Sequence, residues 1–273
     1  MKISCLPVSL FGDIQSGNMS LREWAESAKK IGFDGIDLSM LMLNAHTQTY
    51  IERIQKDFKE VGLPLVMATT YPDFTHPDPK QRLREADYLM RDIALCDQLG
   101  IRYLRVLAGQ AHDGVGLEEG ATLAAEYLRQ ADAVARKYAV KLLYENHAKP
   151  GAWSKIDFSY PLDIFFRVFD ALQDTDIRLN FDIGNIVAQG EDPLAVLERV
   201  IDRVETIHIS DMSAYGKFEA VEIGTGACPI EAVLKRLKAY GFDGWLCIEE
   251  ASGHGLEGIS NAWNYVNGLV SQL

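Results

Sequence analysis

The sequence predicts an α/β protein with a (β/α)8 TIM barrel fold, and three observations support this. Eight short runs rich in Val, Ile and Leu alternate with longer amphipathic stretches along 273 residues. Several of those stretches end in a glycine, which can adopt the left-handed conformation that stops a helix. The segments 31–38, IGFDGIDL, and 240–247, YGFDGWLC, nearly repeat each other at the second and eighth runs. Continuous apolar strands alternating with helices are typical of a parallel sheet covered by helices.

The expected elements follow this alternation in order. Strands are predicted at 2–6, 35–38, 65–68, 103–106, 141–145, 178–182, 206–209 and 245–249. Helices are predicted between them, among them 21–32, 49–62, 81–100 and 122–139. An open doubly wound sheet is the alternative, but no GxGxxG motif follows the first strand. With no linker and no low-complexity tract, residues 1–273 are expected to form a single domain.

The composition of the chain argues against several classes of function. The formal net charge is −12, and an acidic surface disfavours nucleic acid or an anionic membrane as the main partner. No apolar run approaches the roughly 20 residues of a membrane helix, and the N-terminus lacks the features of a signal peptide. The four cysteines form no CxxC pair, which excludes a zinc knuckle and fits a reducing cytoplasm.

Polar residues gather at the predicted ends of the last four barrel strands. Glu145 ends the fifth, Asp182 the sixth, His208 lies at the end of the seventh, and Glu249 and Glu250 end the eighth. Active sites of such barrels lie at the C-terminal ends of the strands. Any one of these acids alone is more often a helix cap or an ion-pair partner. Together they would repel one another without a cation, which favours one divalent metal ion, Mn, Mg, Co, Fe or Zn.

The ordered motifs YENH (144–147), FDIGN (181–185), HISD (208–211) and IEE (248–250) resemble the xylose isomerase-like barrels, which include sugar phosphate isomerases and epimerases. The resemblance covers the whole chain. It implies that Glu145, Asp182, His208 and Glu249 are metal ligands. It also implies that Glu145 and Glu249 carry the catalysis. Glu249 is preferred to Glu250 because neighbouring strand residues point to opposite faces.

The resemblance implies a sugar isomerase or epimerase acting on a small sugar or keto-sugar. One glutamate would remove a proton next to a carbonyl, giving an enediolate that the metal stabilises, and the other would return it. A lyase is the alternative, acting as a dehydratase or eliminase on a keto-sugar, keto-inositol or 3-keto-glycoside. A binding module with a vestigial barrel is a third reading, which the intact set of four ligands disfavours. A homodimer or homotetramer is expected from the family.

This chain differs from the ketose epimerases at three positions that contact substrate in that family. Asn185 stands where they have a histidine, Ala214 where they have an arginine, and Gly151 where they have a glutamate. Six residues remain candidates for contact with substrate or for support of the ligands: His147, Trp153, Asn185, Asp211, His76 and Arg105. Several have ordinary alternatives. Trp153 could simply pack on the rim, Asp211 could hydrogen-bond its own loop, and His76 could be a solvated loop residue. Arg105 could reach an anionic substrate, but neutralising the metal carboxylates is favoured.

Overall fold

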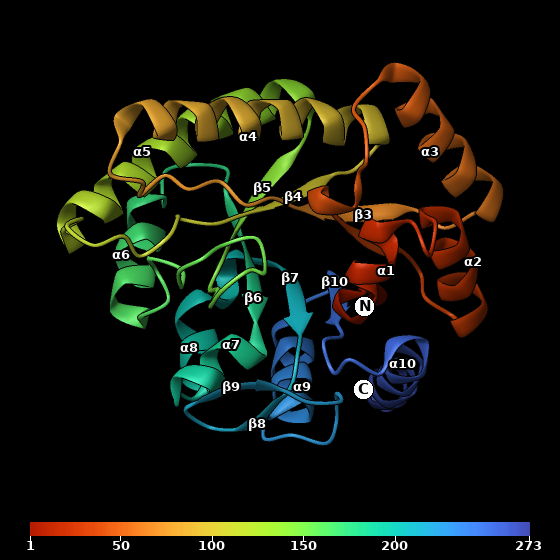
Figure 1. The fold of residues 1–273 in the computed structure, drawn as a ribbon. Helices are drawn as coiled ribbons and strands as arrows, with labels where there is room; N and C mark the ends of the chain where they lie inside the picture. The colour runs from red at the N-terminus through yellow and green to blue at the C-terminus, as the bar shows by residue number, and fades with distance from the viewer. The chain divides into compact units, whose positions relative to one another are not determined.

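The computed structural model describes residues 1–273 (Figure 1). The chain has the predicted (β/α)8 barrel fold, with eight parallel strands each followed by a helix. The barrel strands are β1 (Lys2–Leu6), β2 (Ile36–Ser39), β3 (Leu65–Thr69), β4 (Tyr103–Val106), β5 (Lys141–Glu145), β6 (Arg178–Asp182), β7 (Val204–Ile209) and β10 (Trp245–Glu249). Each lies within two residues of its predicted position.

The helices fill the stretches between the strands. They are α1 (Phe11–Ser16), α2 (Leu21–Ile31), α3 (Gln48–Val61), α4 (Pro79–Leu99), α5 (Leu117–Ala135), α6 (Leu162–Ala171), α7 (Ile183–Gln189), α8 (Pro193–Val200), α9 (Ile230–Tyr240) and α10 (Gly255–Ser271). The predicted stop signals hold, because Gly32, Gly62, Gly100 and Gly241 all have positive φ at helix ends. At the other end of α2, Ser20 and Glu23 form a capping box.

The chain forms two compact units. The first comprises Met1–Val66 and Asn180–Leu273, and the second comprises Met67–Leu179. In the first unit β10 pairs in parallel with both β1 and β7, which places Cys247 opposite His208. In the second unit β4 pairs in parallel with β3 and β5. The expectation of a single domain stays a prediction.

One element was not predicted from sequence. A short antiparallel hairpin, β8 (Met212–Ala214) and β9 (Lys217–Ala220), follows β7 in the first unit. Its turn is formed by Tyr215 and Gly216, and Gly216 has a φ of +73°. β9 is exposed along its whole length, so it lacks the apolar pattern that marked the barrel strands.

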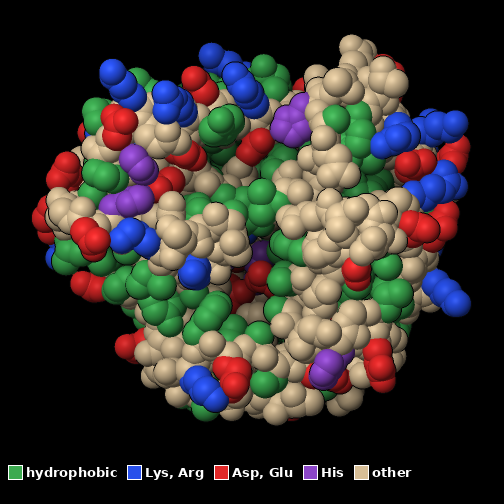
Figure 2. Space-filling view, viewed as in Figure 1, with side chains coloured by type: hydrophobic (Ala, Val, Ile, Leu, Met, Phe, Trp, Pro, Cys, Tyr) green, Lys and Arg blue, Asp and Glu red, His purple; other side chains and the backbone are tan.

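The surface agrees with the acidic composition. On the face shown in Figure 2, red acidic side chains are spread widely and blue basic ones are scattered among them. None of the helices is both long and apolar enough to cross a membrane. The expected cytoplasmic location, the homo-oligomer and the absence of a nucleic-acid or membrane partner stay predictions.

Candidate metal centre

Three of the four predicted ligands come together in the first unit. Asp182 ends β6, His208 is the penultimate residue of β7, and Glu249 ends β10. Ligand atoms of the three side chains all lie within 4.8 Å of one another. Asp182 and His208 are fully buried, whereas Glu249 is 20% exposed. The cluster is therefore embedded in the protein and opens toward solvent on the side of Glu249.

One close contact within the cluster joins His208 and Glu249. The Nδ1 atom of His208 lies 3.0 Å from Oε2 of Glu249. Two carboxylates next to one imidazole concentrate negative charge, and burying such charge is costly unless a cation or hydrogen bonds balance it. One imidazole nitrogen with carboxylate oxygens is also a ligand set that suits divalent metals. The residues present therefore fit a divalent ion.

Asp182 is held in place by its neighbours. It is the N-cap of α7, and the backbone N–H of Asn185 donates to its Oδ1 at 2.6 Å. The hydroxyl of Ser210 lies 3.1 and 3.2 Å from the two carboxylate oxygens. Gly184 makes this approach possible, since a Cβ there would lie 2.2 Å from the Ser210 hydroxyl oxygen. The structure thus shows the helix-cap role considered for such acids, and the role of Asp182 as a metal ligand stays a prediction.

The two successive glutamates have different surroundings. Glu249 faces His208, whereas Glu250 is fully buried and accepts hydrogen bonds from the backbone N–H and the hydroxyl of Ser252. Alternation along the strand sends the two side chains to opposite faces. Glu250 therefore stabilises the turn after β10 through these hydrogen bonds.

The fourth predicted ligand, Glu145, lies in the second unit at the end of β5. Its Oε2 is 3.1 Å from Nε of Arg105, and both side chains are buried. The Arg105 guanidinium also lies 5.0 Å from the centre of the Tyr71 ring, a cation–π contact. Arg105 thus balances the charge of Glu145. The participation of Glu145 in the metal centre stays a prediction.

A buried carboxyl that was not predicted, Asp157, belongs to the same unit. Its Oδ1 accepts hydrogen bonds from the backbone N–H and hydroxyl of Ser159, both at 2.7 Å. Burial raises the pKa of Asp157 to about 7, the charge of Glu145 adds to the rise, and Ser159 and Arg105 oppose it. The only sequence signal is the Asp-x-Ser spacing of a local turn, which carries no information about Glu145.

The other predicted site residues of the second unit lie in loops and make contacts there. The indole N–H of Trp153 donates to the Tyr71 carbonyl at 3.2 Å, and only 7% of Trp153 is exposed. His147 is also buried, just beyond β5. Nδ1 of His76 accepts the N–H of Asp78, and its ring packs edge-on against His112 with centroids 4.9 Å apart. Their contacts with substrate stay predictions.

In the first unit, Asp211 organises the loop that follows the β8–β9 hairpin. Its carboxylate accepts backbone N–H groups of Met212, Gly224, Gly226 and Cys228 at 2.9–3.0 Å. Of the two roles left open for Asp211, the structure supplies the loop hydrogen bonds. Asn185 is buried in the first turn of α7, and the contact seen for it is the backbone hydrogen bond to Asp182.

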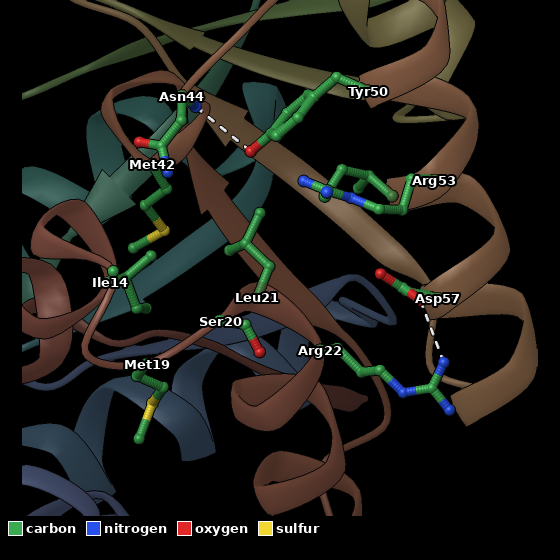
Figure 3. Close-up of a pocket in the computed structure, with 12 residues that line it drawn as sticks. Ile14, Met19, Ser20, Leu21, Arg22, Met42, Asn44, Tyr50, Arg53 and Asp57 are labelled. Carbon is green, nitrogen blue, oxygen red and sulfur yellow. Dashed lines mark hydrogen bonds and ion pairs between the residues drawn. The ribbon is translucent and has the colours of Figure 1, made fainter.

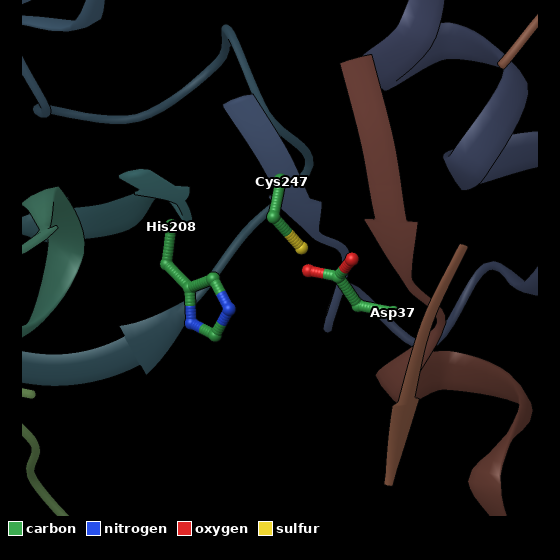
Figure 4. Close-up of side chains that lie close together, drawn as sticks. All are labelled: Asp37, His208 and Cys247. Carbon is green, nitrogen blue, oxygen red and sulfur yellow. The ribbon is translucent and has the colours of Figure 1, made fainter. Parts of the chain in front are cut away.

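Two further buried residues lie close to His208. Asp37 of β2 and Cys247 of β10 lie beside His208, and one possible ligand atom from each of the three residues lies within 4.8 Å of the others (Figure 4). A single acid in the strand IDLS and a cysteine in WLCIE look like ordinary strand residues in the sequence. Only the pairing of strands brings them to His208.

A separate pocket of about 350 Å³ lies among α1, α2 and α3 of the first unit (Figure 3). Ile14, Leu21 and Met42 give it apolar walls. At its edge Arg22 pairs with Asp57 at 3.0 Å. None of the predicted site residues lines it.

Comparisons with known proteins agree on the fold. A family model described as xylose isomerase-like TIM barrel matches residues 25–264. The structure of the "probable 3-DHS dehydratase AsbF" from Bacillus anthracis superposes with a TM-score of 0.81, at 15% identity over 98% of this chain and 99% of that one. The zinc-bound structure of the IOLI protein gives a TM-score of 0.80, at 18% identity over 100% of this chain and 99% of that one.

The sequence relatives are named for two kinds of activity. A Streptomyces coelicolor protein named "Putative hydroxypyruvate isomerase" is 24% identical over 259 residues, covering 90% of both chains. An inosose dehydratase of Clostridium beijerinckii is 23% identical over 150 residues, which cover 48% of this chain and 47% of that protein. The match therefore spans about half the length of that dehydratase.

Proposed function

The chain belongs to the xylose isomerase-like TIM barrel family, and from that premise we propose that it is a divalent-metal-dependent sugar isomerase or epimerase. The observation that carries the proposal is the buried cluster of Asp182, His208 and Glu249, whose ligand atoms lie within 4.8 Å of one another. Glu145, at the end of β5, is the fourth ligand. The zinc atom bound in the IOLI protein, which shares the fold, supports a metal at such a site.

The chemistry is proton transfer next to a carbonyl. A bound divalent ion supplies a Lewis acid that makes that proton more acidic. One of the two glutamates, Glu145 or Glu249, takes the proton from the carbon; the electrons of the broken C–H bond form a C=C bond as the carbonyl π electrons move to oxygen, giving an enediolate. The other glutamate enters the step protonated and gives its proton back, and both glutamates recover their starting forms by exchanging protons with water. Return to the opposite face of the same carbon gives an epimer, and return to the neighbouring carbon gives an aldose–ketose isomer.

Arg105 and Ser210 each support a residue that this chemistry needs. The Arg105 guanidinium lies 3.1 Å from Glu145 and balances the charge of that buried carboxylate. The Ser210 hydroxyl and the Asn185 N–H orient Asp182. Hydrogen bonds of this kind fix a metal ligand before the ion arrives.

A lyase is the second candidate, favoured by the inosose dehydratase relatives and by the fold shared with a 3-DHS dehydratase. The first step is the same proton abstraction. The electron pair then expels the hydroxyl on the next carbon, and that hydroxyl leaves as water after protonation by the second glutamate. Mass spectrometry separates the two functions, because isomerisation conserves the mass of the substrate and dehydration removes one water.

The first experiment measures the metal content of the purified protein, beside that of Asp182→Ala combined with His208→Ala. We expect about one equivalent of a divalent metal in the wild type and its loss in the double variant. The loaded enzyme is then incubated in heavy water with keto-sugars and keto-inositols. Incorporation of deuterium next to the carbonyl is the expected result.

Two glutamine variants test the bases. Glu145→Gln and Glu249→Gln should abolish deuterium incorporation, whereas Glu257→Gln, an exposed position on α10, should leave it unchanged. A wild-type protein that contains no metal and takes none up on titration would refute the mechanism. Full exchange in both glutamine variants would refute the assignment of the bases.

A further inference from the structure

The pocket among α1, α2 and α3 combines an apolar interior with polar groups on one side. Its apolar lining includes Ile14, Leu21, Met42 and Ile54, each of which is at most 6% exposed. Its volume of about 350 Å³ lies at the lower end of the range for small-molecule sites in proteins, which is roughly 300–1,000 Å³. The pocket therefore has room for a small organic molecule, and its interior favours an apolar body.

The polar side of the pocket comes from one face of α3. Tyr50, Arg53 and Asp57 follow one another at intervals of three and four residues, which puts their side chains on the same face of the helix. Figure 3 shows the side chains of Arg53 and Asp57 extending from α3 toward the pocket. The Arg53 guanidinium lies 4.9 Å from the centre of the Tyr50 ring, a cation–π contact that helps to orient it.

The two arginines that line the pocket differ in their partners. Arg22 of α2 pairs with Asp57 at 3.0 Å and with two further carboxylates. Asp57 stands four residues after Arg53, a spacing at which opposite charges often pair, but its carboxylate contacts Arg22 instead. Arg53 forms no ion pair, and the contact seen for its guanidinium is the Tyr50 ring. The pocket thus contains a cationic group that no carboxylate neutralises, in a chain with a net charge of −12.

Further hydrogen-bond donors lie next to Arg53. The hydroxyl oxygen of Tyr50 accepts the backbone N–H of Asn44 at 3.2 Å. A phenol hydroxyl can donate one hydrogen bond while it accepts another, so its proton remains available to a group in the pocket. Asn44 also lines the pocket, and its side-chain amide carries two N–H donors. Together with the guanidinium, these donors match an oxyanion, which accepts several hydrogen bonds at once.

We propose that this pocket is a second ligand site of the protein, and that it binds a small organic anion. A phosphate or carboxylate group contacts Arg53 and Tyr50, and an apolar body packs against Ile14, Leu21 and Met42. Arginine suits this role because its planar guanidinium offers paired N–H donors to the oxygens of either group. The site does not depend on the proposed function, because none of the four proposed metal ligands lines it.

The first test is titration of the 15N-labelled protein with four small molecules, followed by NMR. Butyl phosphate and hexanoate carry the two anionic groups on an apolar chain, inorganic phosphate lacks the chain, and butylamine carries the opposite charge. At least one of the first two should shift the signals of pocket residues, with a dissociation constant below about 1 mM. The tighter of the two identifies the anionic group. Inorganic phosphate should bind about tenfold more weakly or worse, because it buries no apolar surface.

The second test compares two arginines in the same local setting. Arg91 of α4 lies three residues after Tyr88 and 6.0 Å from the centre of its ring, as Arg53 does with Tyr50, but Arg91 does not line this pocket. Arg53→Met should weaken binding of the tighter anion about 10–100-fold, because charge-assisted hydrogen bonds are lost. Arg91→Met should change it by less than about twofold. Tyr50→Phe should also weaken binding, and Tyr88→Phe should not. Thermal melting establishes that each variant is folded.

Three outcomes would overturn the proposal. The first is that neither anion shifts the signals of pocket residues in the millimolar range. The second is that Arg53→Met and Arg91→Met bind the tighter anion equally well. The third is that butylamine binds in the pocket more tightly than either anion, which would assign the pocket to cations through Asp57 instead. All three are read from binding at the pocket, so they stay distinct from a failure of the metal centre.

Discussion

His208 and Glu249 meet across neighbouring strands with Nδ1 and Oε2 only 3.0 Å apart, in a cluster that also contains Asp182. A ligand cluster assembled before the ion arrives holds like charges close together in the metal-free protein. Stability and metal affinity should therefore respond in opposite directions when one charge is removed.

Glu249→Gln tests this opposition. We expect the melting temperature of the metal-free variant to equal or exceed that of the wild type, because a carboxylate near Asp182 is removed. Added metal should stabilise the wild type by about 2.7 kcal/mol at 100 times its dissociation constant, and the variant much less. Thermal melts with and without metal measure both effects. A variant destabilised without metal would contradict the explanation.

Gly184→Ala tests the support of Asp182. The new Cβ would lie 2.2 Å from the Ser210 oxygen and 3.0 Å from the terminal methyl carbon of Met212, so we expect a loss of about 1–3 kcal/mol in unfolding free energy. Combining it with Ser210→Ala should cost less than the sum of the two single changes, because the oxygen that clashes is gone. Urea denaturation of the three variants gives the coupling. Strict additivity would contradict the contact.

Asp157 should make stability depend on pH. Its pKa is raised from 3.8 to about 7 in the folded protein, so the folded state holds a proton that the unfolded state releases between these values. Stability should fall as pH rises from about 4 to 7, by at most about 4 kcal/mol from this group. Asp157→Asn should flatten the decline, and Asp113→Asn, at an exposed position, should not. Urea denaturation across this pH range is the measurement.

Arg105→Met should be strongly destabilising, because it leaves the buried Glu145 without its ion-pair partner. The expected loss is about 3–5 kcal/mol. Adding Glu145→Gln should recover a large part of it, since the unpaired charge is removed as well. Chemical denaturation of the two variants decides this. If the double variant is no more stable than Arg105→Met, the loss of unfolding free energy comes from lost packing against Tyr71 instead.

The barrel strands could be predicted because each is a short apolar run bounded by polar residues or glycine. The β8–β9 hairpin could not, since four exposed residues such as Lys217–Ala220 carry no periodic signal. The clustering of Asp182, His208 and Glu249 could be predicted because the ends of the strands meet on one rim. Asp37 and Cys247 lie within strands, and Asp157 lies in a loop 12 residues beyond Glu145. Which residues lie beside these three depends on contacts between strands and loops, and a single sequence does not show those contacts.

Asp182 begins α7 as well as facing His208. A descendant that lost the proposed metal centre would still be stabilised by an aspartate at this position, because it caps the helix. The presence of this aspartate in a distant homologue is therefore poor evidence that the homologue is an active enzyme. Glu249 caps no helix, so its replacement is the better sign that a member of the family has lost the proposed metal centre.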